Sequence, residues 1–139
     1  MVQIIRVSAG ILTRPSQLLI CQRRAGDVHA LKWEFPGGKL ENGENEAACL
    51  RRELQEELGI QASISTELYR ASHTYLTGRS VALTFFHVPA FQGQLVNRVF
   101  KTLVWVEPAQ LRQYDFLEGN VEFVTSLAQG HWNSLFSLQ

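Results

Sequence analysis

The chain has 139 residues, of which 45% are hydrophobic and 19% charged, so its composition excludes a disordered chain and fits one domain over residues 1–139. Thirteen basic side chains balance thirteen acidic ones, which argues against binding of long nucleic acid and favours a small phosphorylated ligand. The two cysteines match no disulfide framework and no zinc site, and no apolar run approaches the ~18 residues that cross a membrane.

The N-terminal region predicts a β-hairpin. Val2–Leu12 is apolar and β-branched, a turn follows at residues 14–16, and Gln17–Gln22 is a second short apolar strand. The first residues lack a basic segment followed by a long apolar stretch, so they resemble a strand rather than a signal peptide. With no targeting or membrane segment, a cytoplasmic location is expected.

The middle of the chain predicts a loop followed by a helix. Residues 23–32 are polar and irregular, and residues 34–38, with their proline and two glycines, form a loop. Glu44–Leu58 is expected to be a helix that Gly59 ends. Apolar side chains at three- and four-residue spacing form its buried stripe: Ala47, Leu50, Leu54 and Leu58.

The C-terminal half predicts further strands and a second helix. Strands are expected at Ala62–Ser72 and Arg79–Val88, around a turn at 77–78, and at Lys101–Val106; Pro108–Gln113 is expected to be a short helical turn. Gly119–Gln129 predicts a helix whose apolar side carries Val121, Val124, Leu127 and Ala128. Strands interleaved with two helices imply an α/β architecture, a mixed sheet covered on its faces.

Three carboxylates share one face of the first predicted helix. Glu53, Glu56 and Glu57 are three and four residues apart and lie in its last two turns, where the helix dipole disfavours negative charge. Each unfavourable effect is at most about 1 kcal/mol, but local rules broken without structural gain mark functional sites. A divalent cation would relieve the conflict, and Mg²⁺ and Mn²⁺ prefer oxygen ligands. Taken alone, the three glutamates also fit a solvated helix face.

The surrounding pattern removes that ambiguity. Residues 38–60 contain Gly38, Glu44, Arg52-Glu53-Leu54, Glu56-Glu57 and Gly59-Ile60, and this spacing resembles the Nudix signature at every defined position. The segments 34–39 and 22–25, and the strand carrying Trp105, are similar to the MutT branch of that family. The resemblance implies an α/β/α sandwich with a central mixed sheet. It also implies hydrolysis of a nucleoside diphosphate linked to another group, which MutT-type members cleave to a nucleoside monophosphate and pyrophosphate.

The resemblance implies roles for the carboxylate helix. Glu53, Glu56 and Glu57, with the Gly37 carbonyl, are expected to hold Mg²⁺ or Mn²⁺, and Glu53 is the favoured general base, although another carboxylate can take that role. Water would attack the β-phosphorus. Arg52 is expected to hold a catalytic glutamate in place through its guanidinium. Glu44 would support the loop and the helix in the same way.

The substrate contacts are predicted with less specificity. The residues expected to contact the nucleotide are Arg24, Glu34, Phe35, Gly37, Gly38, Tyr75, Arg79 and Asn120, with Leu83 beside the two aromatic residues. Arg24 also fits a solvated arginine, and Phe35 and Tyr75 also fit core packing. Asn120 matches an asparagine that contacts oxidised guanine in MutT-type proteins, and its amide offers a donor and an acceptor to a purine edge. Helix capping is the alternative for Asn120.

One position departs from the family pattern. MutT-type relatives often carry a further metal-binding glutamate six residues before the tryptophan matched by Trp105, and this chain has Val99 there. Valine cannot bind a metal ion. Either the three helix carboxylates suffice or another group such as Glu118 replaces the missing ligand, so the number of metal ions stays open.

The sequence favours an enzyme that removes oxidised purine triphosphates such as 8-oxo-dGTP from the nucleotide pool, a role in DNA repair. A pyrophosphohydrolase of a cytidine or modified pyrimidine triphosphate is the alternative, followed by an enzyme for another nucleoside diphosphate derivative. A non-catalytic domain that senses a nucleotide is disfavoured because every carboxylate of the signature is present. The expected partner is a small-molecule nucleotide, and a monomer and a homodimer both remain open.

Overall fold

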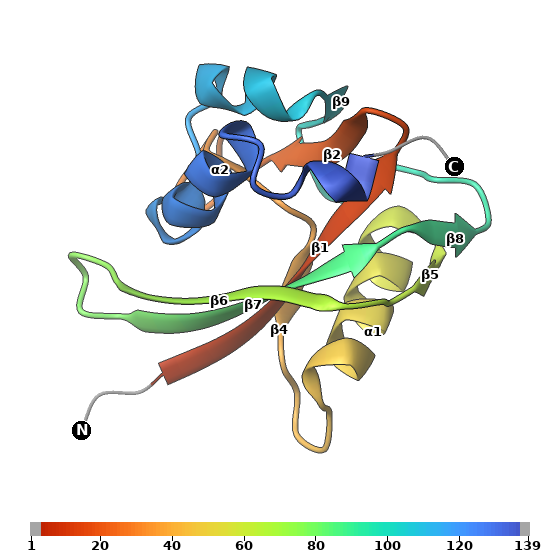
Figure 1. The fold of residues 1–139 in the computed structure, drawn as a ribbon. Coiled ribbons are helices and arrows are strands. Elements are labelled where there is room, and N and C mark those ends of the chain that lie inside the picture. The colour runs from red at the N-terminus through yellow and green to blue at the C-terminus, as the bar shows by residue number, and fades with distance from the viewer. Residues whose placement is uncertain (1–3, 137–139) are drawn as a thin grey trace.

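The computed structural model describes residues 4–136 and shows a mixed sheet between helices (Figure 1). The elements in chain order are β1 (Ile4–Arg14), β2 (Gln17–Gln22), β3 (Trp33–Glu34), β4 (Gly37–Lys39), α1 (Glu46–Leu58), β5 (Gln61–Ser63), β6 (Glu67–Thr74), β7 (Ser80–Val88), β8 (Ala90–Gln92), β9 (Thr102–Val106), the 3₁₀ turns η1 (Pro108–Gln113) and η2 (Glu118–Asn120), α2 (Val121–Ala128) and the 3₁₀ turn η3 (Asn133–Phe136).

Strand β1 organises the sheet. It pairs in parallel with the whole length of β7, from Ile4 opposite Ser80 to Leu12 opposite Val88. It also pairs antiparallel with β2, as the predicted hairpin requires, and with the short strand β4. Strands β3 and β9 extend the sheet from β2, and β6 extends it from β7. The sheet is therefore mixed, as predicted.

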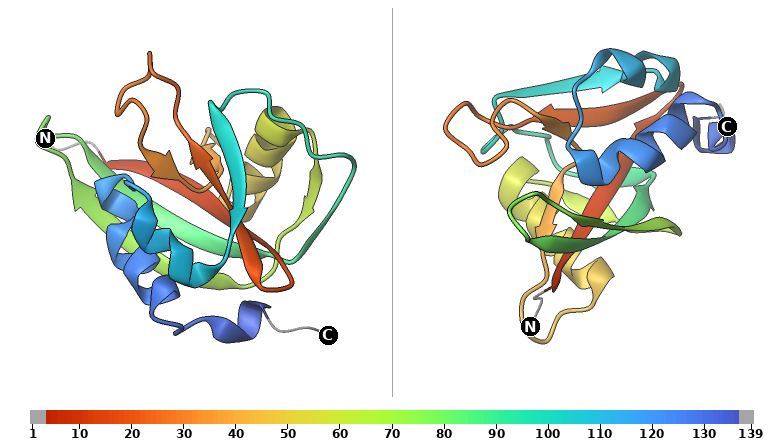
Figure 2. Two further views of the ribbon diagram at one scale, coloured as in Figure 1. Left: turned by 90° about the horizontal axis from the view of Figure 1, so that it is seen from above. Right: turned by 90° about the vertical axis from the view of Figure 1, so that its left-hand side faces the viewer.

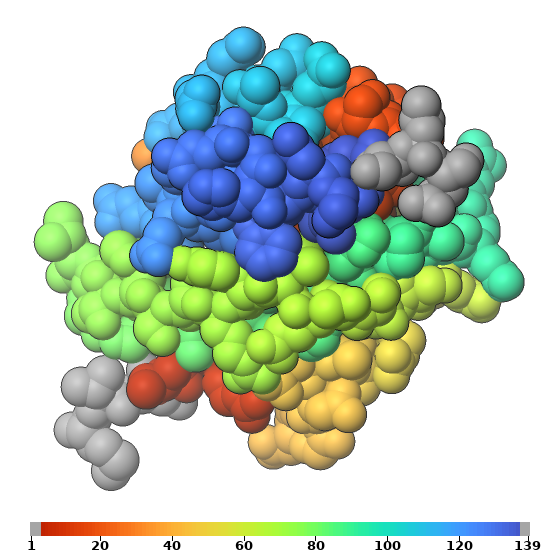
Figure 3. Space-filling view, in the orientation of Figure 1, coloured from red at the N-terminus to blue at the C-terminus, as the bar shows by residue number. Residues whose placement is uncertain are grey.

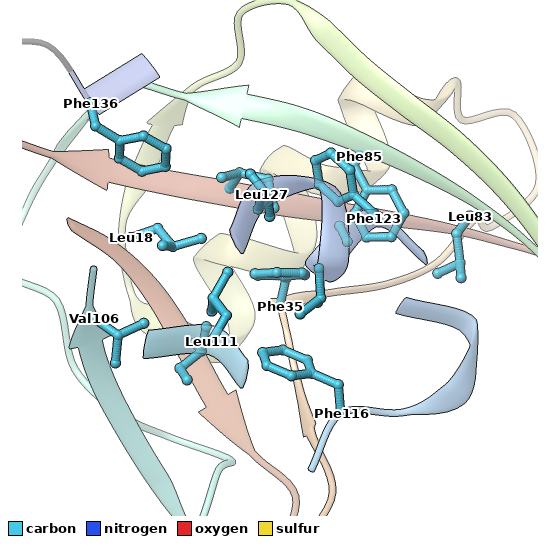
Figure 4. Packing of buried hydrophobic residues seen from close by; sticks show 14 residues of the cluster. Leu18, Phe35, Leu83, Phe85, Val106, Leu111, Phe116, Phe123, Leu127 and Phe136 are labelled. Atoms are coloured by element: carbon cyan, nitrogen blue, oxygen red, sulfur yellow. The ribbon is translucent and has the colours of Figure 1, made fainter. Parts of the chain in front are cut away.

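Helices cover both faces of the sheet (Figure 2), and two separate cores lie beneath them. On one face, helix α1 buries Cys49, Leu50, Leu54 and Leu58 against Leu12, Leu19 and Val88. On the other face, α2 and η1 pack over an aromatic group in which the Phe85 and Phe123 rings are 4.6 Å apart and Phe35 and Phe116 5.5 Å apart (Figure 4). Helices on both faces confirm the predicted sandwich.

The C-terminal helix is fixed to the edge of the sheet. The Tyr69 ring of β6 stacks on Phe123 of α2 with centroids 5.1 Å apart, and the Tyr69 hydroxyl donates a hydrogen bond to Glu122. In the space-filling view the blue C-terminal segment lies directly on the yellow-green strand β6 (Figure 3). This contact determines which residues of α2 are buried.

The first helix begins later than predicted. Its N-cap is Asn45, whose side chain accepts a hydrogen bond from the Ala48 N–H, so Glu44 precedes the helix rather than opening it. Asparagine is a favoured N-cap because its side chain binds an otherwise free backbone N–H. The predicted C-terminal end is correct, since Gly59 adopts the left-handed conformation at φ +70°.

Several strand predictions were incomplete. The loop predicted at residues 34–38 contains parts of β3 and β4, and the predicted strand at 62–72 is two strands, β5 and β6, in different sheets. Strand β8, which pairs with β5, and the 3₁₀ turn η3 were not predicted. Strand β1 extends to Arg14, beyond the predicted end, and positions 2 and 3 of the predicted strand lie outside the described residues.

One side of the C-terminal helix was also assigned wrongly. Val121 is 47% exposed, whereas Phe123 is fully buried, because α2 rests on Tyr69 and Phe85 through Phe123. The prediction was right for Val124 and Leu127, which are buried, and Ala128 packs at the edge of the same core. Among the helices of residues 4–136, none is long and apolar enough to cross a membrane.

We expect Phe123→Ala to destabilise the fold by ~3–5 kcal/mol, because the substitution leaves a large cavity beside Phe85 and Tyr69. Val121→Ala, in the same helix but exposed, should change the free energy of unfolding by no more than ~0.5 kcal/mol. Urea denaturation of both variants measures the difference. Similar losses for the two variants would contradict the packing described for α2.

Candidate active site

A cavity of about 600 Å³ opens between β1, β4, the tip of the β6–β7 hairpin and the turn before α2. Its lining combines backbone from β4, a carboxylate from α1, aromatic and aliphatic groups from the sheet, and polar groups at its mouth. The residues that line it include Ser8, Arg23, His29, Glu34, Phe35, Gly37, Gly38, Lys39, Glu57, Tyr75, Arg79, Leu83 and Asn120. A concave site with apolar walls and few charged groups is typical of small-molecule binding.

Two glycines of β4 allow its backbone to lie close to both β1 and α1 at the edge of the cavity. Gly37 has φ +155°, and a Cβ atom there would lie 2.0 Å from the Ser8 carbonyl oxygen of β1. A Cβ atom on Gly38 would lie 2.3 Å from Cδ of Glu53. Only glycine fits at these two positions, since a side chain would collide with backbone at one and with a carboxylate at the other.

The three carboxylates of α1 surround this backbone. The Gly37 N–H donates to Glu57 Oε1 at 3.1 Å, and Glu57 lines the cavity. Glu53 is half-buried against Gly38, and Glu56 is exposed at the edge. The structure therefore brings the four predicted metal-binding residues to one place, at the C-terminal end of the helix.

Arg52 holds this cluster together. Its Nη1 donates to Glu53 Oε1 at 2.8 Å and to Glu56 Oε2 at 3.2 Å, while its Nη2 donates to the Lys39 carbonyl at 3.0 Å. The Nε and Nη2 atoms of Arg52 also donate to the two carboxylate oxygens of Glu44, at 2.6 and 3.0 Å. The predicted supporting positions of Arg52 and Glu44 fit this geometry. Hydrogen bonds from Arg52 and from the Glu41 N–H lower the pKa of Glu44 to about 2.

The surroundings of Glu57, the α1 carboxylate that lines the cavity, disfavour its ionised form. Burial raises the pKa of Glu57 to about 9, with further contributions from the negative charges of Glu53 and Glu34, against the opposing hydrogen bond from Gly37. Burial also raises the pKa of Glu53, although Arg52 opposes that effect. A cation beside these groups would favour their ionised forms.

The residues fit a divalent cation, although the side chains are not yet arranged around one. Within residues 4–136, no three carboxylate, imidazole or thiolate groups converge into a ready-made ion site. The reason is that Glu53 and Glu56 each turn an oxygen to Arg52, and Glu57 turns one to Gly37. These bonds use one oxygen of each carboxylate, and an all-oxygen set of three carboxylates suits a hard divalent ion.

Most of the predicted substrate residues line the cavity. Phe35 and Leu83 form apolar wall, Tyr75 and Arg79 come from the hairpin tip, and Asn120 is 4% exposed at the start of α2. The Asn120 side chain makes no capping hydrogen bond, so the helix-capping alternative is wrong. Phe35 lines the cavity and also packs against Phe85 and Phe116 in the core, so it fits both interpretations.

Arginine placement differs from the prediction. Arg24 is exposed and its backbone N–H binds Asp27, whereas the neighbouring Arg23 lines the cavity. Arg23 donates to the two carboxylate oxygens of Glu34 at 3.3 and 3.1 Å. Burial still raises the pKa of Glu34 despite this ion pair. The sequence held a signal for Arg23, since side chains alternate in direction at the end of a strand, but the register of β2 was needed to use it.

Two histidines lie beside Tyr75, one of the residues that line the cavity. The Tyr75 ring lies between the imidazoles of His29 and His73, with centroids 4.7 and 4.5 Å away, and its hydroxyl accepts a hydrogen bond from Gly119 N–H at 3.4 Å. Glu118 pairs with His73 at 3.1 Å. That contact gives Glu118 a partner on β6 rather than on the carboxylate helix.

Comparison with known proteins agrees with this geometry. The family model for the NUDIX domain matches residues 4–127. The chain is 39% identical over 120 residues to the CTP pyrophosphohydrolase of Escherichia coli (strain K12), covering 86% of this chain and 87% of that protein. It is 33% identical over 126 residues to an 8-oxo-dGTP diphosphatase of Haemophilus influenzae, covering 90% and 92%.

A solved structure shares the arrangement of elements. The solution structure of the Escherichia coli ORF135 protein superposes with a TM-score of 0.82 at 32% identity, covering 95% of this chain and 94% of that one. Sequence signature, fold and site geometry lead to the same assignment. The chain belongs to the Nudix family of hydrolases, enzymes that generally need a divalent metal ion.

Proposed function

We propose that the protein hydrolyses a nucleoside triphosphate to a nucleoside monophosphate and pyrophosphate with Mg²⁺ or Mn²⁺. One observation carries the proposal: the same cavity is lined by Glu57, Gly37 and Gly38, which suit phosphates and a cation, and by Phe35 and Asn120, which suit a base. Phosphoryl transfer needs mainly positioning and charge stabilisation, and this lining offers both.

The chain's own residues have distinct roles in this proposal. Glu53, Glu56, Glu57 and the Gly37 carbonyl would hold the cation, which would supply positive charge to the phosphate oxygens and acidify water. Glu53 would accept the proton of the water that attacks the β-phosphorus, since its carboxylate lies against Gly38 at the phosphate end of the site. Arg52 keeps Glu53 in place.

An oxidised purine such as 8-oxo-dGTP is the favoured substrate. The buried Asn120 amide can donate to and accept from a purine edge, and Phe35 and Leu83 offer apolar wall beside it. Relatives named 8-oxo-dGTP diphosphatase, at 33% identity for the protein from Haemophilus influenzae, support the same base.

A cytidine triphosphate is the second candidate. The relative named CTP pyrophosphohydrolase is 39% identical to this chain, and an asparagine amide can also pair with the amino and carbonyl groups of cytosine. The two candidates share the reaction and differ only in the base. A panel of 8-oxo-dGTP, dGTP, CTP, dCTP, nucleotide sugars and ADP-ribose, compared by kcat/KM with Mg²⁺, tests both the reaction and the base.

Glu57→Gln should lower kcat for nucleoside triphosphates by ~10²–10³-fold, because the substitution removes a negative charge from the cation site and several kcal/mol of charge stabilisation. Glu46→Gln is the matched control, since Glu46 lies in the same helix and pairs with Arg6 and Arg70 outside the cavity. Pyrophosphate release with Mg²⁺ is the measurement. Wild-type turnover by Glu57→Gln would overturn the metal assignment.

The metal-free protein should lose stability as the pH rises. Because the pKa of Glu57 is about 9 in the folded chain and 4.5 in the ordinary carboxyl, the folded state binds an extra proton between about pH 5 and pH 9. The free energy of unfolding therefore falls with pH in that range, by at most ~1.4 kcal/mol per unit. Urea denaturation in EDTA between about pH 6 and 8 measures the slope. Glu57→Gln should make it shallower, and equal slopes would contradict the shift.

Asn120→Ala should change base selectivity rather than the reaction. Loss of the amide removes hydrogen bonds to the preferred base, and we expect kcat/KM for that substrate to fall by ~10–100-fold with a smaller loss for the other bases. The same nucleotide panel gives the measurement, with Asn133→Ala as the control, because Asn133 is exposed on η3 and lies outside the cavity lining. Equal losses for every base would argue against base recognition by Asn120.

A further inference from the structure

The C-terminal end of α1 is bound by the loop that precedes β9. The Val96 N–H donates to the Leu58 carbonyl at 2.9 Å, and the Arg98 N–H donates to the Glu57 carbonyl at 3.1 Å. The Arg98 guanidinium adds a third bond, from Nη1 to the Gln55 carbonyl at 3.1 Å. The last four carbonyls of a helix have no partner within it, and the loop supplies partners for those of Glu57 and Leu58. The Gln55 carbonyl, which also accepts the Gly59 N–H at 3.0 Å, gains a second donor from Arg98.

Arg98 is itself held in place. A Cβ atom on Gly59 would lie 3.0 Å from Arg98 Nη2 and 3.3 Å from its Cζ, so the guanidinium rests on the glycine that ends the helix. On the other side, the Asn97 side chain binds both the N–H and the carbonyl of Phe100 at 2.9 Å. Phe100 is buried in the core beneath α1, at 7% exposure. The loop therefore has a defined shape even without regular secondary structure.

The position of Arg98 matters because of what the helix end carries. The last turn of α1 contains no basic residue but includes Glu56 and Glu57, and a helix C-terminus is itself negative. Arg98 brings a positive charge to this end from outside the helix. Its side chain is exposed, so the charge itself is screened and weak, and the directional hydrogen bonds dominate.

We propose that Arg98 is a positioning residue for the metal site. Its side chain binds the Gln55 carbonyl and its backbone N–H binds the Glu57 carbonyl, so Arg98 fixes the last turn of α1 and with it the direction in which Glu57 projects toward Gly37. The inference rests on the proposed function, which assigns these carboxylates to the cation. Displacement of such groups by about 1 Å is enough to cost two orders of magnitude in rate.

The sign of the effect on metal binding separates positioning from simple electrostatics. Removing a positive charge near a cation site strengthens cation binding if charge alone matters. Removing a group that orders the ligands weakens it. The two explanations therefore predict opposite changes in the metal dissociation constant for the same substitution at Arg98.

The experiment uses the variants Arg98→Met and Arg98→Lys. The control is Arg51→Met, because Arg51 is an exposed arginine of α1. Mn²⁺ binding is measured by electron paramagnetic resonance without nucleotide, and kcat and KM are measured with the nucleoside triphosphate that the wild type prefers. Arg98→Met should weaken Mn²⁺ binding and lower kcat, each by about tenfold, with little change in KM. Arg98→Lys keeps one donor for the Gln55 carbonyl and should recover part of both, and Arg51→Met should match the wild type.

The outcomes are distinct. Unchanged or tighter Mn²⁺ binding by Arg98→Met would overturn the positioning role while leaving the proposed function intact, provided that the wild type still hydrolyses triphosphates. Failure of the wild type to bind Mn²⁺ or to hydrolyse any triphosphate would overturn both. If Arg98→Met unfolds, Arg98→Lys decides the matter: a lysine variant with lower Tm but wild-type Mn²⁺ affinity and kcat would show that Arg98 acts on stability alone.

Discussion

The close approach of β4 to both β1 and α1 is the constraint on which the site depends. Gly37 lies where any side chain would meet the Ser8 carbonyl, and Gly38 lies where a side chain would meet the Glu53 carboxylate. The pairing of β4 with β1 therefore brings a bare stretch of backbone against the acidic end of the helix. Cavity, backbone carbonyl and carboxylates occupy one place because two residues have no Cβ atom.

This arrangement concentrates negative charge where a helix least favours it, and the fold compensates in part. Arg52 binds Glu53 and Glu56, the Gly37 N–H binds Glu57, and Arg98 binds the last carbonyls of α1. These partners do not offset the cost of ionising Glu57, since its pKa remains raised by burial and by its acidic neighbours. The free-energy cost that remains in the metal-free chain is the part that a bound cation would relieve.

The sequence predicted what depends on local spacing. The helix, its carboxylate face and its glycine end follow from a period of 3.6 residues and appear as expected, apart from the start at Asn45. The strands β3 and β4 were missed because they exist only through pairing with distant residues of β2 and β1. The exchange of Arg24 for Arg23 in the cavity has the same origin, since the register of β2 decides which side chain points inward.

The carboxylate helix and the segment around Asn120 are packed in different cores. Helix α1 packs on one face of the sheet with its own cluster, while α2, which follows Asn120, packs on the other. Changes near Asn120 or the β6–β7 hairpin can therefore alter the cavity wall that includes Leu83 and Asn120 without moving helix α1. Relatives of similar identity carry names with different bases, CTP and 8-oxo-dGTP, as expected if the carboxylate helix keeps the chemistry while a separately packed wall changes the substrate.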